Sequence, residues 1–233
     1  MTNQLIQIKI KSRLNKGDSE DYTNIPCWQI QEAFNKAQRE WVRRQVDGIN
    51  QKRSGREDSS QSIADLQNLL VTWKDGYIDK HLYYESCDFP EDFIIFARIS
   101  AFAESDCCPP RRLRIYQAEE SDIDILLADP NKNPNFEWAE TFATFFGNKI
   151  RIYTNDKFKL IDPQVIYYRK PITVQFFGCT DTETGNISIL DVESEFRDSV
   201  IELIIDDAAA ILAKDFEMQQ TAQNLQQNEQ HNT

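Results

Sequence analysis

Residues 34–45 read FNKAQREWVRRQ and lie in the middle of a longer amphipathic pattern. At 100° per residue, the apolar side chains around this stretch share one face of a helix and the charged side chains lie opposite. Pro26 suits the first turn, because its missing N–H has no helical partner there, and Gly48 suits the end. The pattern predicts a core helix from residue 26 to about residue 46. Its apolar face consists of Ile30, Ala33, Phe34, Ala37 and Trp41.

The flank of the same helix has a second regular feature. Trp28, Asn35 and Val42 recur every seventh residue, between the apolar and the charged face. Their position indicates contact from two directions, either because Asn35 bonds backbone within the chain or because the flank meets another subunit. We favour the intramolecular interpretation for Asn35. The charged face is available to neighbours, and we predict that Arg39 and Arg43 on it bind a partner.

Three further segments have helical spacing. Residues 3–16 are basic and loosely periodic, and we predict a helix there, although IQIKI at 6–10 also alternates like a strand. Residues 62–73 follow a suitable N-cap, Ser62, and predict another helix that ends near Gly76. A wide apolar stripe predicts a C-terminal helix over 191–216. Its start carries three acids, which suit the helix dipole there: Asp191, Glu193 and Glu195.

The middle of the chain, residues 77–180, has the composition of strands. The clearest signal is ATFFGNKIRIYT at 143–154, where two β-rich arms flank Gly147 and Asn148, a two-residue hairpin turn. EESDIDILLADP at 119–130 predicts a short helix stopped by Pro130.

These patterns together predict an α+β fold, in which a helical bundle from both chain ends carries a mainly antiparallel β insertion. The expected parts are N-terminal helices over 1–76, the β-rich insertion over 77–190, a C-terminal helix over 191–216 that packs with the N-terminal helices, and a polar tail over 217–233.

The charge balance is acidic. Lys and Arg number 26 against 38 Asp and Glu, which gives a net charge of −12 and a pI of about 4.7. Such a surface argues against wrapping nucleic acid, but an anionic wall would let DNA pass without gripping its phosphates. No apolar run approaches the roughly 20 residues that span a bilayer. The first residues lack the features of a signal peptide, so we expect a soluble chain that is not exported by that route.

Signatures of catalysis and metal binding are missing from the sequence. It has two histidines, His81 and His231, and no nucleophile elbow, phosphate loop or zinc-protease motif. Its five cysteines include no C-x-x-C pair, and we expect reduced thiols, no metal site and no cofactor. We therefore predict that the protein is not an enzyme. The acidic pair Asp122 and Asp124 leaves a metal-dependent nuclease as the alternative.

Five weak motifs occur in one order along the chain: IPCWQIQEAFNKAQREWV at 25–42, DFPEDFIIFARIS at 88–100, FFGNKIRIYT at 145–154, VIYYRKP at 165–171 and DSVIELIIDDAAAIL at 198–212. In this order they resemble the head-to-tail adaptor proteins of tailed phages. The resemblance is closest to the neck ring, or head completion, proteins of short-tailed and crAss-like phages, and it covers about residues 3–217.

The resemblance implies a structural virion protein without enzymatic activity or cofactors. Members of that family form a closed ring, typically a dodecamer, which attaches below the portal protein, joins it to further neck or tail rings and surrounds the DNA channel. The expected location is the head-tail junction of the virion, with assembly in the cytoplasm of the bacterial host. DNA would pass without sequence specificity, and no membrane is involved. The competing hypotheses are a small phage nuclease using Asp122 and Asp124, and a capsid or tail accessory protein.

The C-terminal tail, residues 217–233, is rich in Gln and Asn and poor in residues that form a core. Met218, Ala222 and Leu225 continue the helical spacing of Phe216. We expect Phe216, Met218 and Leu225 to dock on the portal. Repeated copies around a ring would offset the entropy lost on ordering.

Overall fold

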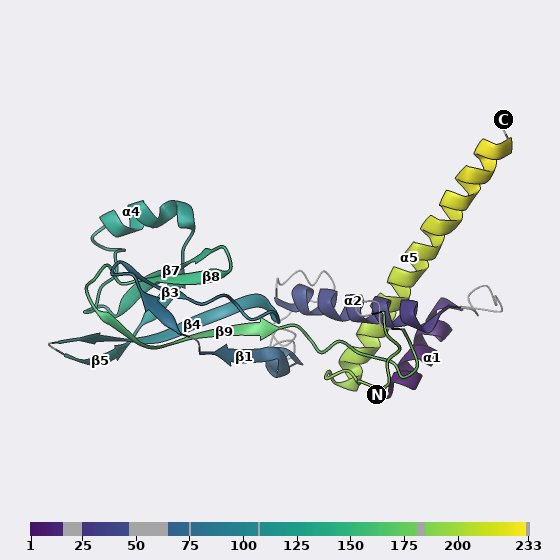
Figure 1. Ribbon diagram of the computed structural model, residues 1–233, viewed down its shortest axis with the longest axis horizontal. Coiled ribbons are helices and arrows are strands. Elements are labelled where there is room, and N and C mark those ends of the chain that lie inside the picture. Colours follow the sequence, from purple (N-terminus) through teal and green to yellow (C-terminus); the bar gives the residue numbers. More distant parts are fainter. Residues whose placement is uncertain (16–24, 47–64, 75, 107, 181–184, 232–233) are drawn as a thin grey trace. The chain divides into compact units, whose positions relative to one another are not determined.

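The computed structural model describes residues 1–15, 25–46, 65–74, 76–106, 108–180 and 185–231, with side chains only to residue 216 in the last range and to residue 45 in the second. The chain divides into two compact units (Figure 1). Unit 1 comprises Met1–Asn68 and Pro171–Thr233, and unit 2 comprises Leu69–Lys170.

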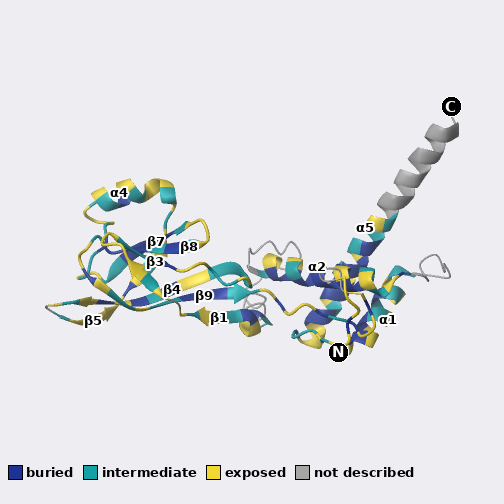
Figure 2. Cartoon of the chain, in the orientation of Figure 1, coloured by how far each residue is buried: buried dark blue, intermediate teal, exposed yellow. Residues whose placement is uncertain are grey.

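The described part of unit 1 includes three long helices, α1 (Asn3–Leu14), α2 (Cys27–Val46) and α5 (Asp198–His231). The predicted helices over 3–16 and 26–46 are confirmed. All five residues predicted for the apolar face of α2 are buried, and α5 packs against both α2 and α1 (Figure 2). At the centre of this packing, Trp41 meets Phe196 edge to face, with 5.2 Å between ring centroids.

Ion pairs align α1 with α5. The N-terminal ammonium lies 2.9 Å from the Asp198 carboxylate, Lys9 pairs with Glu202, and Arg13 Nε lies 2.7 Å from Asp206 Oδ1. Because these partners advance in the same order along both helices, α1 and α5 run in the same direction.

The predicted fold class, a helical bundle from both chain ends with a β insertion, is wrong. The described residues form a mixed fold rich in strands, with nine strands in two sheets and a single helix from the C-terminal part. The helix expected over 62–73 illustrates the reason. Of its described residues, 65–66 are α-helical and lead into a short 3-10 turn, η1 (Gln67–Leu69). Strand β1 (Leu70–Trp73) follows and pairs with β9 (Lys159–Arg169). Leu-Val-Thr-Trp fits a pleated, half-buried surface, and this pairing overrides the helical spacing of the leucines.

The C-terminal helix begins later than predicted, at Asp198 rather than Asp191. The acids expected in its first turn form other hydrogen bonds. Asp191 accepts a hydrogen bond from the Asn3 side-chain amide at 2.6 Å, and Glu195 accepts one from the Ile172 backbone N–H at 2.9 Å. At its other end α5 continues to His231, through most of the polar tail (Figure 1).

Unit 2 contains both sheets. One has the order β1-β9-β4-β5, with β4 at Phe93–Ser105 and β5 at Cys108–Arg112. The other has the order β2-β3-β8-β7-β6, formed by Tyr77–Asp79, Tyr83–Ser86, Lys149–Tyr153, Glu140–Phe146 and Arg114–Gln117. Neighbouring strands are antiparallel except β6 and β7, which are parallel.

The two sheets share one core. Ile99 and Val165 from the first sheet pack with Ala143, Ile150 and Ile152 from the second. The hairpin predicted at 143–154 is confirmed as β7 and β8, and Gly147 has a φ of 60°, the positive value that this turn requires. The predicted short helix is confirmed as α4 (Ile123–Ala128), which follows the 3-10 turn η2 (Glu120–Asp122).

Candidate interaction surface

Helix α2 presents three side-chain amides on one face, Gln31, Asn35 and Gln38. They bind the backbone of an extended segment of unit 1 that begins at Pro171. The Asn35 side chain donates a hydrogen bond to the Val174 carbonyl at 3.0 Å and accepts one from the Val174 N–H at 2.8 Å. Gln31 accepts from the Phe176 N–H at 2.9 Å, and Gln38 donates to the Ile172 carbonyl at 2.9 Å.

The spacing explains why a helix can substitute for a neighbouring strand here. Four residues of helix rise about 6 Å, and two residues of extended chain advance about 6.6 Å. Amides at i, i+4 and i+7 of α2 therefore meet every second residue of the segment. The intramolecular interpretation of Asn35 is confirmed. Gln31 and Gln38 were not predicted, because the repeat of Trp28, Asn35 and Val42 does not include them.

Two further anchors hold the same segment. Asn3 of α1 donates to the carbonyls of Gln175 and Val192, both at 3.0 Å. Cys27, the first residue of α2, forms a disulfide with Cys179, with 5.7 Å between their Cα atoms. The expectation of reduced thiols is therefore wrong for this pair. The cysteines lie 152 residues apart in the sequence, and spacing arguments gave no sign of their proximity.

The anchored segment exposes large apolar side chains. We call Phe177, Ile187, Ile189 and Leu190 the apolar quartet; their exposed fractions are 73, 66, 80 and 68%. The backbone next to Phe177 and Ile187 is paired, since Gly178 N–H donates a hydrogen bond to Ser188 O and Ser188 N–H donates one to Cys179 O, at 2.9 and 2.8 Å. Exposed apolar side chains on a fixed backbone are typical of a surface that binds another macromolecule.

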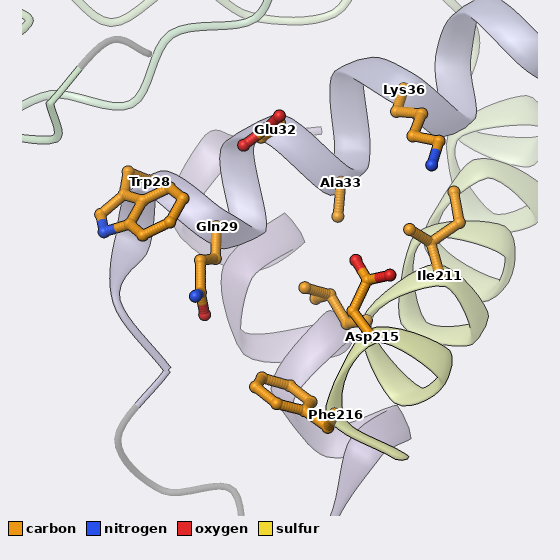
Figure 3. Close-up of a pocket in the computed structure, with 9 residues that line it drawn as sticks. Trp28, Gln29, Glu32, Ala33, Lys36, Ile211, Asp215 and Phe216 are labelled. Carbon is orange, nitrogen blue, oxygen red and sulfur yellow. The ribbon is translucent and has the colours of Figure 1, made fainter. Parts of the chain in front are cut away.

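A groove lies between α2 and α5 in the same unit, with a volume of about 350 Å³. Figure 3 shows Trp28, Glu32 and Lys36 of α2 facing Ile211, Asp215 and Phe216 of α5 across it. Trp28 is 39% exposed. The groove thus combines an apolar lining with charged side chains of both signs.

The predicted partner-binding residues do not form one cluster. Phe216 is half-buried and lines the groove. Arg39 is half-buried and Arg43 exposed on α2, and neither lines the groove. Within the described part of the chain neither arginine forms an ion pair, whereas their neighbour Arg44 pairs with Asp207. Met218 and Leu225 belong to α5, but their side chains lie outside the described residues.

Asp122 and Asp124, the alternative nuclease pair, are exposed at η2 and α4. Across the described ranges, no three His, Cys, Asp or Glu side chains are grouped to hold a metal ion. None of the described helices combines the length and apolar character needed to cross a membrane.

Comparison with known proteins adds no relative: no protein-family model matches this sequence, and no curated protein matches it. The resemblance to phage adaptors consequently rests on the five ordered motifs alone.

Proposed function

We propose that this protein is a structural component of a tailed-phage virion, a head-to-tail adaptor that assembles into a ring below the portal. The observation that supports it best is the exposure of the apolar quartet on a segment whose backbone is anchored. Three amides of α2, the Asn3 side chain and a disulfide anchor that segment. A monomer gains nothing from anchoring apolar side chains in water. The anchoring is useful if the quartet packs against a neighbour.

A ring requires two different complementary surfaces on each subunit, because a head-to-tail contact repeats around the axis. Unit 1 offers such a pair of surfaces. One is the apolar quartet, with the exposed acids Asp191 and Glu193 next to it in the sequence. The other is the exposed side of α2, which carries Arg39, Arg43 and the lining of the groove. Opposite charges would set the register of the contact and the apolar side chains would supply its area.

The acidity of the C-terminal region fits the same role. Residues 191–233 contain ten acids and two basic residues. A channel wall with this balance does not release counterions by binding phosphates, so DNA would slide past it. The portal above and further neck or tail rings below are the proposed partners, and the head-tail junction is the proposed location.

Imaging tests the proposal directly. Purified protein, alone and mixed with the portal protein of its own phage, is expected to show closed rings and ring-on-portal complexes in negative stain. Deletion of all residues after Glu217 is expected to leave the thermal unfolding midpoint nearly unchanged and to abolish co-purification with the portal. A full-length protein that stays monomeric or dimeric even with its portal would contradict the adaptor function.

A surface substitution tests which face assembles. Ile189→Asp places a charge in the apolar quartet without touching the core, so the protein should fold but remain monomeric in sedimentation velocity. Ile125→Asp is the matched control, since Ile125 is 67% exposed on α4 of unit 2. Arg39→Glu combined with Arg43→Glu should weaken the same assembly at moderate salt. Equal assembly by the Ile189 variant and the control would exclude the quartet from the contact.

A further inference from the structure

Unit 2 contains a hollow of its own. It has a volume of about 250 Å³ and is bordered by β6, α4, the loop 129–139 and the start of β7. Two aromatic side chains line it, Tyr116 and Trp138, which are 37% and 54% exposed. Its polar lining consists of Asn131, Lys132, Asn133 and Glu140.

The loop that carries most of this lining is held by its own hydrogen bonds. Asp129 Oδ1 accepts from the Asn131 N–H at 2.9 Å, and Asn135 Oδ1 accepts from the N–H groups of Glu137 and Trp138 at 2.7 and 3.2 Å. Tyr116 adds a bond from its hydroxyl to the Lys132 carbonyl at 3.2 Å. The shape of the hollow is therefore fixed before anything binds.

The backbone at Trp138 is also unusual. Ala139 has a φ of 52°, in the left-handed region that a residue with a Cβ seldom adopts. This strain and the Asn135 turn together hold a tryptophan at the surface, where it is 54% exposed and loses about half of the stabilisation that full burial would provide. An aromatic ring that is exposed beside polar side chains, at a cost in stability, indicates a binding site.

We propose that this hollow binds one sugar ring of a carbohydrate, with the ring stacked on Trp138. One face of a pyranose is made of C–H groups and packs on an aromatic ring, while its hydroxyls need neighbouring donors and acceptors. The hollow supplies both kinds of contact. This inference does not depend on the adaptor function and goes beyond it.

The hydrogen-bonding capacity left in the hollow suits hydroxyl groups. The side chains of Asn131 and Lys132 have no hydrogen-bond partner among the residues described. The Asn133 side-chain oxygen accepts a hydrogen bond from Lys157, which leaves its NH₂ group as a donor. One Glu140 carboxylate oxygen accepts a hydrogen bond from Arg114 at 3.0 Å, which leaves the other oxygen as an acceptor. Amide and carboxylate groups side by side can bind hydroxyls that donate and accept in turn.

The charges disfavour a phosphate-bearing ligand. Lys132 is the one cation of the lining, and the Glu140 carboxylate opposes any anion. Burial, together with the negative charge of Glu140, raises the pKa of Tyr116, so its hydroxyl stays protonated at neutral pH and keeps its bond to the loop.

The test uses the full-length protein and saturation-transfer NMR with a panel of glucose, galactose, mannose, rhamnose and N-acetylglucosamine. At least one sugar should receive saturation on its ring protons, and titration should show binding at least tenfold weaker in Trp138→Ala. Phe102→Ala, which removes an exposed aromatic side chain of β4 in unit 2, should bind as the wild type does. Asn131→Ala should weaken binding without changing the unfolding midpoint.

Three results would overturn the proposal. The first is that no sugar of the panel binds at millimolar concentration. The second is that binding persists equally in Trp138→Ala and Phe102→Ala. A Trp138-dependent signal from oligothymidylate with none from the sugars would assign the hollow to nucleobases instead.

Discussion

Replacing Trp41 by alanine is expected to lower the free energy of unfolding of unit 1 by about 3–5 kcal/mol, the usual cost of removing a buried large aromatic side chain. Trp41 is 4% exposed and packs edge to face on Phe196, which precedes α5. The substitution therefore removes contacts between the α2 side and the α5 side of the helical core. A cavity of this size cannot close without moving a helix.

The measurement is urea unfolding followed by circular dichroism at 222 nm, which reports mainly on the helices of unit 1. Trp41→Phe is the informative companion variant. It keeps an aromatic ring against Phe196 and removes a buried indole N–H that has no hydrogen-bond partner among the described residues. We expect it to retain most of the stability. A loss below about 1 kcal/mol in Trp41→Ala would place this residue outside the core.

Replacing Asn35 by leucine is expected to be the second most damaging single change, with a cost of about 3 kcal/mol. Asn35 is 6% exposed and satisfies both the N–H and the carbonyl of Val174. Leucine has nearly the same size, so the cost comes from two buried backbone groups left without partners, at about 1–3 kcal/mol each.

Two observations separate this effect from a general loss of helix stability. Lys36→Leu changes the next residue of α2, which is exposed, and should leave the free energy of unfolding almost unchanged. Hydrogen exchange at the Val174 and Phe176 amides should accelerate strongly in Asn35→Leu, while the amides of β7 in unit 2 keep their protection. Unchanged exchange at Val174 would show that the amide does not hold the segment.

The predicted function depends on that segment as much as on the helices. The adaptor proposal requires an apolar surface that stays in place before assembly, and the amides of α2 provide the fixed backbone for it. Asn35→Leu should consequently reduce assembly as well as stability. Ile189→Asp should reduce assembly alone, which separates the support of the surface from the surface itself.

The amphipathic helix over 26–46 was predictable because its signal is local. Its apolar spacing, Pro26 at the start and the buried face with Phe34 and Trp41 all follow from one stretch of chain. The hairpin at Gly147 was predictable for the same reason, since two adjacent strands and a turn with positive φ leave a pattern within twelve residues.

The candidate site was only partly visible in the sequence. Asn35 was recognised as a polar residue that needs a partner. Phe216 lines the groove, and its contact with a partner stays a prediction. The apolar quartet was missed entirely. Residues 177–190 mix Phe and Ile with Thr, Gly, Asn and acids, so they have neither helical nor strand periodicity to mark them.

By itself the sequence determined the local elements: α1, α2, α4, the β7–β8 hairpin and the absence of motifs for familiar catalysis. Tertiary structure alone decided that residues 70–73 are a strand, because their partner β9 lies about ninety residues later and its pairing outweighs leucine spacing. It also decided that residues 191–197 stay extended, because Asn3 and the Ile172 N–H bind Asp191 and Glu195. The disulfide between Cys27 and Cys179 likewise depends on the tertiary structure, which brings the two segments together. Contacts between segments that are distant in the sequence leave no periodicity in either segment, and here they place the surface on which the proposed function depends.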